Sequence, residues 1–280
     1  MKIGFFDSGF GGLTILKEVV KKLPDYSYLY LGDNARAPYG SRDQETIYEF
    51  TKQGVEKLFT LGAQVVVLAC NTSSSSALRR LQQEWLPEHY LDRRVLGIIV
   101  PTAEEIGRHT KTGRVGVLGT EATVSSEAYP KEIQKRASSN HEIGPREEII
   151  VYQQACPLLV PMIEAGEAGS VELEQAVNGY LAQLFAQDKD IDAVILGCTH
   201  YGLIEDVFAK NLPAGVTLVS QGKLVAEKLA DYLARHPELE GKLECAWERH
   251  FYSTEDSERI THLAAEFFGA PIKVEAIILD

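Results

Sequence analysis

The chain has 280 residues, a length that predicts about two domains at roughly 150 residues per domain. Hydrophobic residues make up 45% and charged residues 24% of it, which is ordinary for a globular protein and argues against fibrous, disordered and disulfide-scaffold classes. Lys and Arg number 28 against 40 Asp and Glu, so the net charge of −12 argues against nonspecific binding to nucleic acid or to an anionic membrane surface.

Short β-rich runs alternate with amphipathic helical stretches along most of the chain. We expect buried strands at residues 2–6, 26–32, 64–69, 94–100, 114–119, 147–153, 192–197 and 216–220. Apolar residues recur at helical spacing over residues 13–23, 43–62, 173–187 and 224–236, and residues 247–256 predict a last short strand. This alternation predicts an α/β fold with helices covering a largely parallel sheet.

The sequence lacks the usual signs of export or membrane insertion. No apolar run approaches the roughly 18 residues of a membrane-spanning helix, and Asp7 interrupts the apolar start of the chain. The four cysteines have no CxxC spacing, and a reducing compartment would keep them as thiols. We therefore expect a cytoplasmic protein with no membrane partner.

Two segments of the chain share one plan, which suggests two similar halves. Residues 65–78 (VVVLACNTSSSSAL) and 193–206 (AVILGCTHYGLIED) both run from four apolar residues through a small residue to Cys and then to a helix. GFFDSG near residue 4 resembles VGVLGT near residue 115 in the same way. Any two strand–helix units of a parallel sheet look somewhat alike, so an accidental match stays open.

Cys70 and Cys198 each fall where a predicted strand ends and a helix begins. Ligands bind at this end of an open α/β sheet, and the helix dipole there lowers a thiol pKa and favours a carboxylate. Free cysteine is otherwise often a small buried hydrophobe. Two cysteines in one setting, each followed by polar side chains, indicate a functional pair as readily as a structural one.

The residues around these cysteines separate three kinds of chemistry. Cys198 and His200 have no compact Cys/His pair elsewhere to complete a tetrahedral metal site, so we expect no metal. A hydrolase would use one thiol with His200 as its base and leave the second cysteine without a role. Proton exchange at a carbon atom uses both: a thiolate removes the α-proton and a thiol delivers a proton from the opposite side.

Five motifs occur in order along the chain: DSGFGGL (7–13), GDNARAPYG (32–40), ACNTSSS (69–75), ACPLLVPMIE (155–164) and GCTHYGL (197–203). Together they resemble the glutamate racemases of the cofactor-independent Asp/Glu racemase superfamily. The resemblance implies two pseudosymmetric open α/β domains, residues 1–96 with 208–280 and residues 97–207, and an active site in the cleft between them. It also implies catalytic acid/base thiols at Cys70 and Cys198, L- or D-glutamate as substrate, and no cofactor.

The resemblance implies a substrate-binding set whose members each have an ordinary structural alternative. The set is Asp7, Ser8, Tyr39, Gly40, Asn71, Thr72, Thr199 and His200. Asp7 would pair with the substrate ammonium or orient a thiol, and would otherwise cap a helix. Without the resemblance, Tyr39 and Gly40 would be interpreted as part of a loop, and the hydroxyl and amide side chains of the set as helix caps. A lone histidine such as His200 would be interpreted as a structural residue.

Several positions leave roles open. Asp33 and Glu164 match acidic family positions but alone read as surface charges, and Cys156 and Cys245 have no functional context. Gly202, the serine pair at 75–76 and Ser220–Gln221 depart from the family pattern, the last where an acidic residue is common. These departures concern loop rigidity and domain closure rather than the two thiols.

Three other functions remain compatible with the sequence: a racemase for aspartate, a noncatalytic binder of small dicarboxylates, and a thiol hydrolase. The family resemblance favours D-glutamate supply for peptidoglycan synthesis and allows a homodimer. Because the first expected strand begins at Lys2, we expect no N-terminal extension of the kind that binds a cell-wall precursor as activator.

Overall fold

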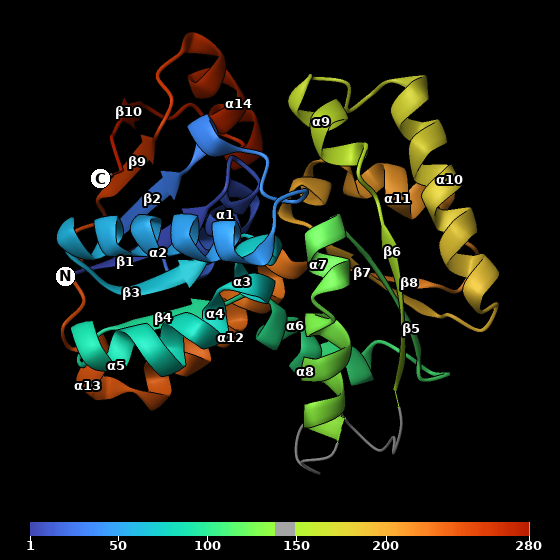
Figure 1. The fold of residues 1–280 in the computed structure, drawn as a ribbon, viewed down its shortest axis with the longest axis horizontal. Coiled ribbons are helices and arrows are strands. Elements are labelled where there is room, and N and C mark those ends of the chain that lie inside the picture. The colour runs from blue at the N-terminus through green and yellow to red at the C-terminus, as the bar shows by residue number, and fades with distance from the viewer. Residues whose placement is uncertain (138–148, 280) are drawn as a thin grey trace.

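Two parallel sheets organise the chain in the computed structural model, which describes residues 1–137 and 149–279 (Figure 1). The larger sheet has, in spatial order, β10 (Val274–Ala276), β9 (Arg249–Ser253), β2 (Tyr28–Gly32), β1 (Lys2–Asp7), β3 (Ala63–Leu68) and β4 (Arg94–Gly97). The smaller sheet has β6 (Ile150–Ala155), β5 (Arg114–Gly119), β7 (Ala193–Gly197) and β8 (Thr217–Val219). All neighbouring strands are parallel, which confirms the predicted fold class.

The helices fill the connections between these strands. They are α1 (Gly12–Lys22), α2 (Gln44–Thr60), α3 (Asn71–Ser76), α4 (Leu78–Arg80), α5 (Leu86–His89), α6 (Ile99–Glu105), α7 (Glu121–Ser125), α8 (Ala128–Ala137), α9 (Leu159–Glu164), α10 (Val171–Gln187), α11 (Glu205–Asn211), α12 (Gln221–Arg235), α13 (Pro237–Glu240) and α14 (Glu258–Phe268). Short 3₁₀ turns lie at Asn34–Arg36, Ile106–Arg108 and Thr199–Ile204, and a π-helical turn lies at Leu81–Trp85.

Two expected strands differ from the observed elements. The run at residues 94–100 ends as a strand at Gly97, because α6 begins at Ile99. Its apolar side chains suit a buried helix as well as a buried strand, and Pro101 is tolerated in a first helical turn. Residues 147 and 148 of the strand expected at 147–153 lie outside the described residues, and β6 spans Ile150–Ala155.

The two sheets repeat one topology. In each, the first strand of the unit lies between the second and the third, and the fourth follows the third: β2-β1-β3-β4 and β6-β5-β7-β8. β3 and β7 are the third strands of their units, and Cys70 and Cys198 follow their ends. The pseudosymmetry expected from the repeated sequence plan is therefore present in the strand order.

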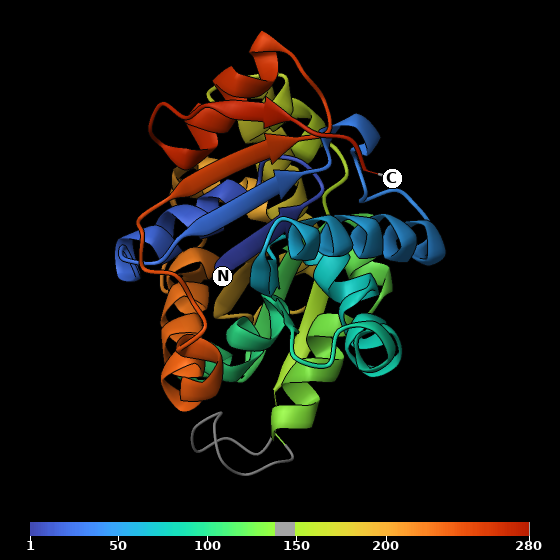
Figure 2. The same cartoon turned by 90° about the vertical axis from the view of Figure 1, so that its left-hand side faces the viewer.

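Alternating side chains of the strands pack on opposite faces of the larger sheet. Phe5 belongs to the core that includes α1, α12 and α14, whereas its neighbour Phe6 belongs to the core on the α2 side. α2 and α12 accordingly lie on opposite sides of this sheet (Figure 2). α2 comes close because residue 54 is glycine: a β-carbon there would collide with the Phe6 ring.

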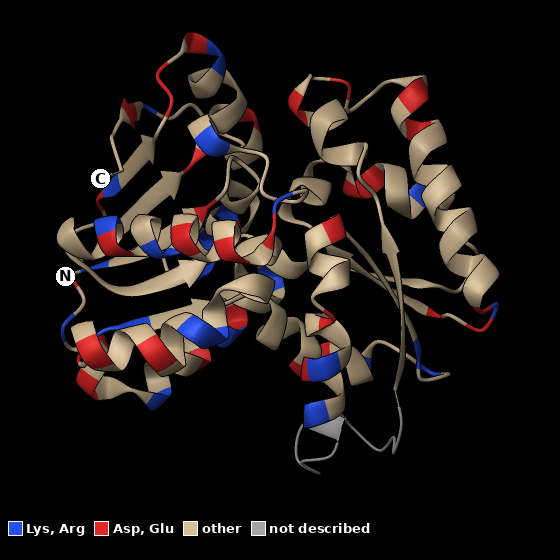
Figure 3. Ribbon diagram, in the orientation of Figure 1, with Lys and Arg blue, Asp and Glu red and all other residues tan. Residues whose placement is uncertain are grey.

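The chain leaves the larger sheet after β4 and returns to it with β9. Between these two points, β8 pairs with β7 in the smaller sheet. α12 then carries the chain back against α1. Both α2 and α8 carry acidic and basic residues (Figure 3). Across residues 1–137 and 149–279, no helix has the length and apolar character needed to cross a membrane.

Candidate active site

The ends of the parallel strands from both sheets surround one cavity of about 140 Å³. A single water molecule needs roughly 10–15 Å³ of such space, so the cavity is large enough for a small ligand. All ten residues singled out from the sequence line it: Asp7, Ser8, Tyr39, Gly40, Cys70, Asn71, Thr72, Cys198, Thr199 and His200. The fold thus brings together residues nearly two hundred positions apart, at the end of the sheets where α/β proteins bind ligands.

Cys70 lies at the start of α3, where its sulfur interacts with the helix. The Sγ atom accepts a hydrogen bond from the Ser73 backbone N–H at 3.4 Å and lies 3.4 Å from Ser8 Oγ. Burial raises the pKa of the Cys70 thiol, and the Asp7 carboxylate adds to this, while the hydrogen bonds from Ser8 and Ser73 act to lower the pKa. The thiol form of Cys70 is therefore favoured. The Ser8 hydroxyl and the Ser73 N–H are placed to donate hydrogen bonds to the thiolate when it forms.

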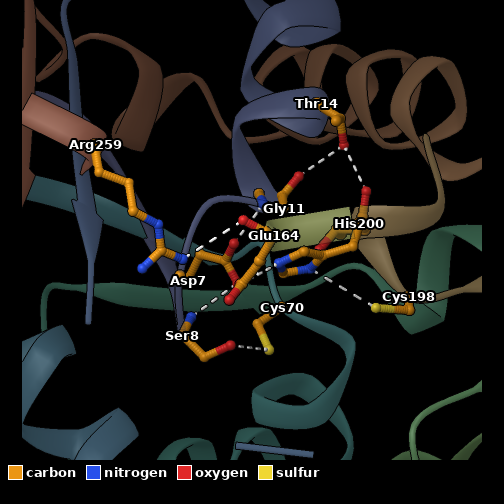
Figure 4. Close-up of polar contacts among 12 residues, drawn as sticks. Asp7, Ser8, Gly11, Thr14, Cys70, Glu164, Cys198, His200 and Arg259 are labelled. Carbon is orange, nitrogen blue, oxygen red and sulfur yellow. Dashed lines mark hydrogen bonds and ion pairs between the residues drawn. The ribbon is translucent and has the colours of Figure 1, made fainter. Parts of the chain in front are cut away.

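Cys198 ends a chain of polar contacts on the other side of the cavity. Its Sγ lies 3.9 Å from His200 Nδ1, and His200 Nε2 lies 2.9 Å from Glu164 Oε1 at the end of α9 (Figure 4). Burial acts to lower the pKa of His200, but the hydrogen bonds with Cys198 and Glu164 raise the pKa well above 6.5. A protonated His200 is thus held between the Glu164 carboxylate and the Cys198 sulfur.

Glu164 is the anionic partner in this chain. Burial acts to raise the pKa of its carboxyl group, but the hydrogen bond and charge of His200 and the charge of Arg259 bring the pKa below 4.5. The sequence alone suggested a surface charge. The structure instead places the Glu164 carboxylate in the cavity wall, 36 residues along the chain from the histidine it holds.

Glu164→Gln should remove a pH-dependent part of the stability. The stabilisation that goes with the lowered pKa of Glu164 is complete above pH 4.5 and is lost as the pH falls through the folded pKa. The stabilisation that goes with the raised pKa of His200 is complete below pH 6.5 and is lost as the pH rises through the folded pKa. The melting temperature of the parent should therefore exceed that of the variant most between these two values, by at least ~2 °C.

Thermal unfolding between pH 4 and 9 measures this difference. Glu238→Gln is the matched control, because Glu238 pairs with His236 at 3.1 Å on the exposed surface, where ion pairs contribute little. A difference between parent and Glu164→Gln that does not change with pH would show that the ion pair is not its source.

Asp7 is fully buried and performs the structural task that the sequence allowed. Its carboxylate accepts the backbone N–H groups of Ser8, at 2.8 Å, and of Gly12 at the start of α1, and it accepts the Tyr30 hydroxyl at 3.2 Å. Burial raises the pKa of Asp7 against the opposing effects of His200 and these donors. Asp7 therefore anchors α1 and also lines the cavity, so the two alternatives do not exclude each other.

Asp33 does not line the cavity and acts on the loop that does. Its carboxylate accepts hydrogen bonds from the Tyr39 hydroxyl, from Arg36 Nε at 2.6 Å and from Thr254 Oγ1 at 2.9 Å. Burial and the Asp33 carboxylate raise the pKa of Tyr39, so its hydroxyl keeps the proton that it donates. Asp33 thus fixes the cavity loop through Tyr39 rather than facing the cavity.

The structure adds wall residues that the sequence analysis did not select. Thr120, at the end of β5, lines the cavity with its Oγ1 atom 3.0 Å from Thr72 Oγ1. The match between GFFDSG and VGVLGT was the available signal, because Thr120 directly follows β5 as Ser8 directly follows β1. Cys156 also lines the cavity; burial raises its pKa and its Sγ lies 3.6 Å from the Gln154 carbonyl, whereas Cys245 is exposed.

Within residues 1–137 and 149–279, no three His, Cys, Asp or Glu side chains are grouped so that they could hold a metal ion. The cavity walls in this part of the chain contain no Lys or Arg. Its donors are instead the neutral hydroxyl and amide groups of Ser8, Asn71, Thr72 and Thr199, beside the single titratable nitrogen base His200. The lining thus offers neutral hydrogen-bond donors, carboxylates and thiols to a small polar ligand.

Comparison with known proteins identifies the family that has this fold and these residues. Residues 13–229 match the family described as Asp/Glu/hydantoin racemase. The chain belongs to this racemase family. A glutamate racemase of Paracoccus denitrificans is 40% identical over 286 residues, covering 99% of this chain and 100% of that protein.

Solved structures of this racemase family agree over the full length. A glutamate racemase isoform from Bacillus anthracis superposes with a TM-score of 0.85 at 32% identity, covering 99% of this chain and 97% of that one. A glutamate racemase from Francisella tularensis, solved in complex with D-glutamate, has a TM-score of 0.83 at 33% identity and covers 100% of this chain and 98% of that one. The resemblance to glutamate racemases, which are isomerases, is confirmed.

Proposed function

We propose that this protein interconverts L- and D-glutamate without a cofactor, using Cys70 and Cys198 as the two acid/base groups. The observation that carries the proposal is the placement of two cysteines at equivalent strand ends of two like sheets, both in the wall of one cavity. A reaction that takes a proton from one side of a carbon and returns one to the other needs such a pair. The names of the full-length relatives, and the D-glutamate bound to one of them, support glutamate as the substrate.

In the proposed reaction one cysteine, as thiolate, removes the α-proton of glutamate, and the electron pair of the C–H bond passes into the substrate carboxylate. The other cysteine, as thiol, then donates its proton to the opposite face of the α-carbon and becomes the thiolate. A thiolate is a far weaker base than the carbanion it creates, so the site must stabilise that carbanion. Donors placed in advance in a closed cavity can do this.

The neutral donors suit this task. Asn71, Thr72 and Thr199 would bind a substrate carboxylate without adding a fixed positive charge, and Ser8 would contribute a hydroxyl. Asp7 and Glu164 provide negative charge for the substrate ammonium. His200 assists Cys198 through its 3.9 Å contact, while Ser8 assists Cys70.

Incubation of the protein with each enantiomer of glutamate in the presence of EDTA tests the proposal. We expect the optical rotation to decay to zero from both directions, because the reaction needs only the chain's own thiols. Binding without decay would identify a dicarboxylate binder, and an acyl group trapped on one cysteine would identify a thiol hydrolase. Either result would overturn the proposed function.

The choice of substrate gives a separate prediction. Glutamate should exceed aspartate in kcat/KM, because a site arranged for the distal carboxylate leaves polar groups unpaired when the chain is one methylene shorter. The penalty is of order 1–3 kcal/mol, or roughly tenfold or more. Steady-state kinetics on both amino acids measures the ratio. Equal values would contradict the glutamate assignment and leave the racemase family intact.

We further infer that the D-glutamate supplies peptidoglycan synthesis in the cytoplasm, as the family resemblance implies. The absence of a membrane-spanning helix in the described residues is compatible with this place of action. Growth of a deletion strain only when D-glutamate is provided would support this role. The domain boundaries at residues 96/97 and 207/208 and a homodimer remain predictions.

A further inference from the structure

Three buried side chains close a ring of hydrogen bonds behind the cavity. The Tyr129 hydroxyl donates to Asn71 Oδ1 at 2.7 Å, Asn71 Nδ2 donates to Gln221 Oε1 at 2.6 Å, and Gln221 Nε2 donates to the Tyr129 oxygen at 2.9 Å. The exposed fractions are 2% for Asn71, 0% for Tyr129 and 3% for Gln221. Each side chain therefore donates to one member of the ring and accepts from the other.

The ring determines which way the Asn71 amide points. An asparagine amide has an acceptor oxygen and a nitrogen with two N–H groups. If it were flipped, the Asn71 oxygen would face Gln221 Oε1 and its nitrogen would face the Tyr129 hydroxyl, which donates to it now. With the observed orientation, one N–H of the Asn71 amide donates to Gln221, and the second N–H is not part of the ring. Asn71 lines the cavity, so this second N–H is available for a ligand there.

The ring joins three helices from different parts of the fold. Asn71 begins α3, next to Cys70, Tyr129 is on α8 beside the smaller sheet, and Gln221 begins α12 (Figure 1). Gln221 Nε2 also lies 3.1 Å from Thr102 Oγ1 and 3.2 Å from the Ile98 carbonyl, at the segment where the chain passes from the larger to the smaller sheet. The Asn71 amide is thus oriented in part by Tyr129, which comes from the smaller-sheet half of the molecule.

The chemistry of residue 221 fits this task. A carboxylate at this position could only accept hydrogen bonds. The glutamine accepts from Asn71 and also donates to Tyr129, so the Tyr129 proton stays directed at Asn71. Burial, together with the charge of Cys198, raises the pKa of Tyr129, which keeps that proton in place.

We propose that Tyr129 and Gln221 are positioning residues that turn the free N–H of Asn71 toward the bound substrate carboxylate. The proposal rests on the proposed glutamate racemase function for the identity of the substrate. It predicts that Tyr129 and Gln221 act on the substrate only through Asn71.

Tyr129→Phe removes one hydroxyl and leaves the ring open. We expect kcat/KM for glutamate to fall about tenfold, which corresponds to ~1.4 kcal/mol. Most of the fall should be a rise in KM, because the Asn71 N–H contacts the carboxylate before and during proton transfer. Gln221→Leu, which opens the ring at another corner, should act in the same direction and serves if Tyr129→Phe folds poorly.

Combination with Asn71→Ala separates positioning from a general structural effect. In the Asn71→Ala background there is no amide to orient, so adding Tyr129→Phe should change kcat/KM by less than about twofold. Equal losses in the two backgrounds would overturn the proposal. Thr102→Val is the matched control, because it removes a Gln221 contact outside the ring and should leave KM near that of the parent.

A binding measurement keeps this test independent of turnover. The affinity of the Cys70→Ser/Cys198→Ser protein for D-glutamate, measured by calorimetry, should fall about tenfold on adding Tyr129→Phe, ~1.4 kcal/mol. If the parent does not racemise glutamate, the proposed function fails, and this measurement still decides whether the ring orients Asn71. Unchanged D-glutamate affinity would overturn the positioning role even if the parent is an active racemase.

Discussion

Replacing either Cys70 or Cys198 with serine should abolish racemisation in both directions while leaving one half-reaction in place. Serine has a similar shape but a far less acidic hydroxyl, so complete turnover should fall at least about a thousandfold, or ~4 kcal/mol. In the proposed mechanism, which here follows the family resemblance, Cys70 takes the α-proton of D-glutamate and Cys198 takes that of L-glutamate. Each single variant keeps one competent base on one face of the substrate.

Deuterium exchange in heavy water measures the half-reactions. Cys198→Ser should exchange the α-proton of D-glutamate faster than that of L-glutamate, and Cys70→Ser should show the reverse preference, because the remaining thiol can return a solvent deuteron with retention. Mass spectrometry of both enantiomers after incubation gives the two rates. Cys245→Ser is the matched control, since Cys245 is exposed and is not among the residues that line the cavity.

Two outcomes would contradict the two-thiol mechanism. Either a single variant keeps nearly parental racemisation, or both variants exchange the same enantiomer. Another base would then have to act, and the cavity offers Asp7 and His200 for this role. The distinct surroundings of the two thiols, with Ser8 beside Cys70 and His200 beside Cys198, make unequal residual rates the expected result.

Local rules predicted the sheets and the position of Cys70 and Cys198 at strand ends, whereas the substrate-binding set was predicted from the family resemblance. A buried apolar run of five or six residues followed by a helix places the next residue at the carboxyl end of a parallel strand, as for Cys70 and Cys198. Such ends converge when the sheets face each other, so listing the strand ends approximates the cavity wall. The same reasoning applied to β5 would have selected Thr120.

Other features depend on contacts that no local pattern encodes. Glu164 faces His200 only because α9 of the smaller-sheet half is brought to the turn after β7, and Asp33 holds Tyr39 only through the path of the loop. Ile98 and Ile99, which follow the early end of β4 at Gly97, are buried in two different hydrophobic clusters. Short apolar runs do not distinguish strand from helix, so tertiary packing decides.

Gly11→Ala should lower kcat/KM by about a hundredfold, because a displacement near 1 Å in a reacting group can cost that much. A β-carbon on Gly11 would lie 2.4 Å from Thr199 Oγ1 and 2.5 Å from His200 Nδ1, the residues that follow Cys198. The backbone itself would accept alanine, since Gly11 has φ −53° and ψ −37°. The collision must therefore push the Cys198 turn away from α1 and disturb the His200 contact.

Deuterium exchange shows which of the two cysteines is affected by Gly11→Ala. Exchange of the α-proton of L-glutamate, assigned to Cys198, should drop far more than exchange of D-glutamate, assigned to Cys70, because the collision lies on the Cys198 side. Gly179→Ala in α10 is the matched control: it has open space around it, and the same change in a helix should leave activity unchanged and raise stability by up to ~1 kcal/mol. Parental exchange of both enantiomers by Gly11→Ala would show that the close approach of α1 does not hold the Cys198 turn in its reactive position.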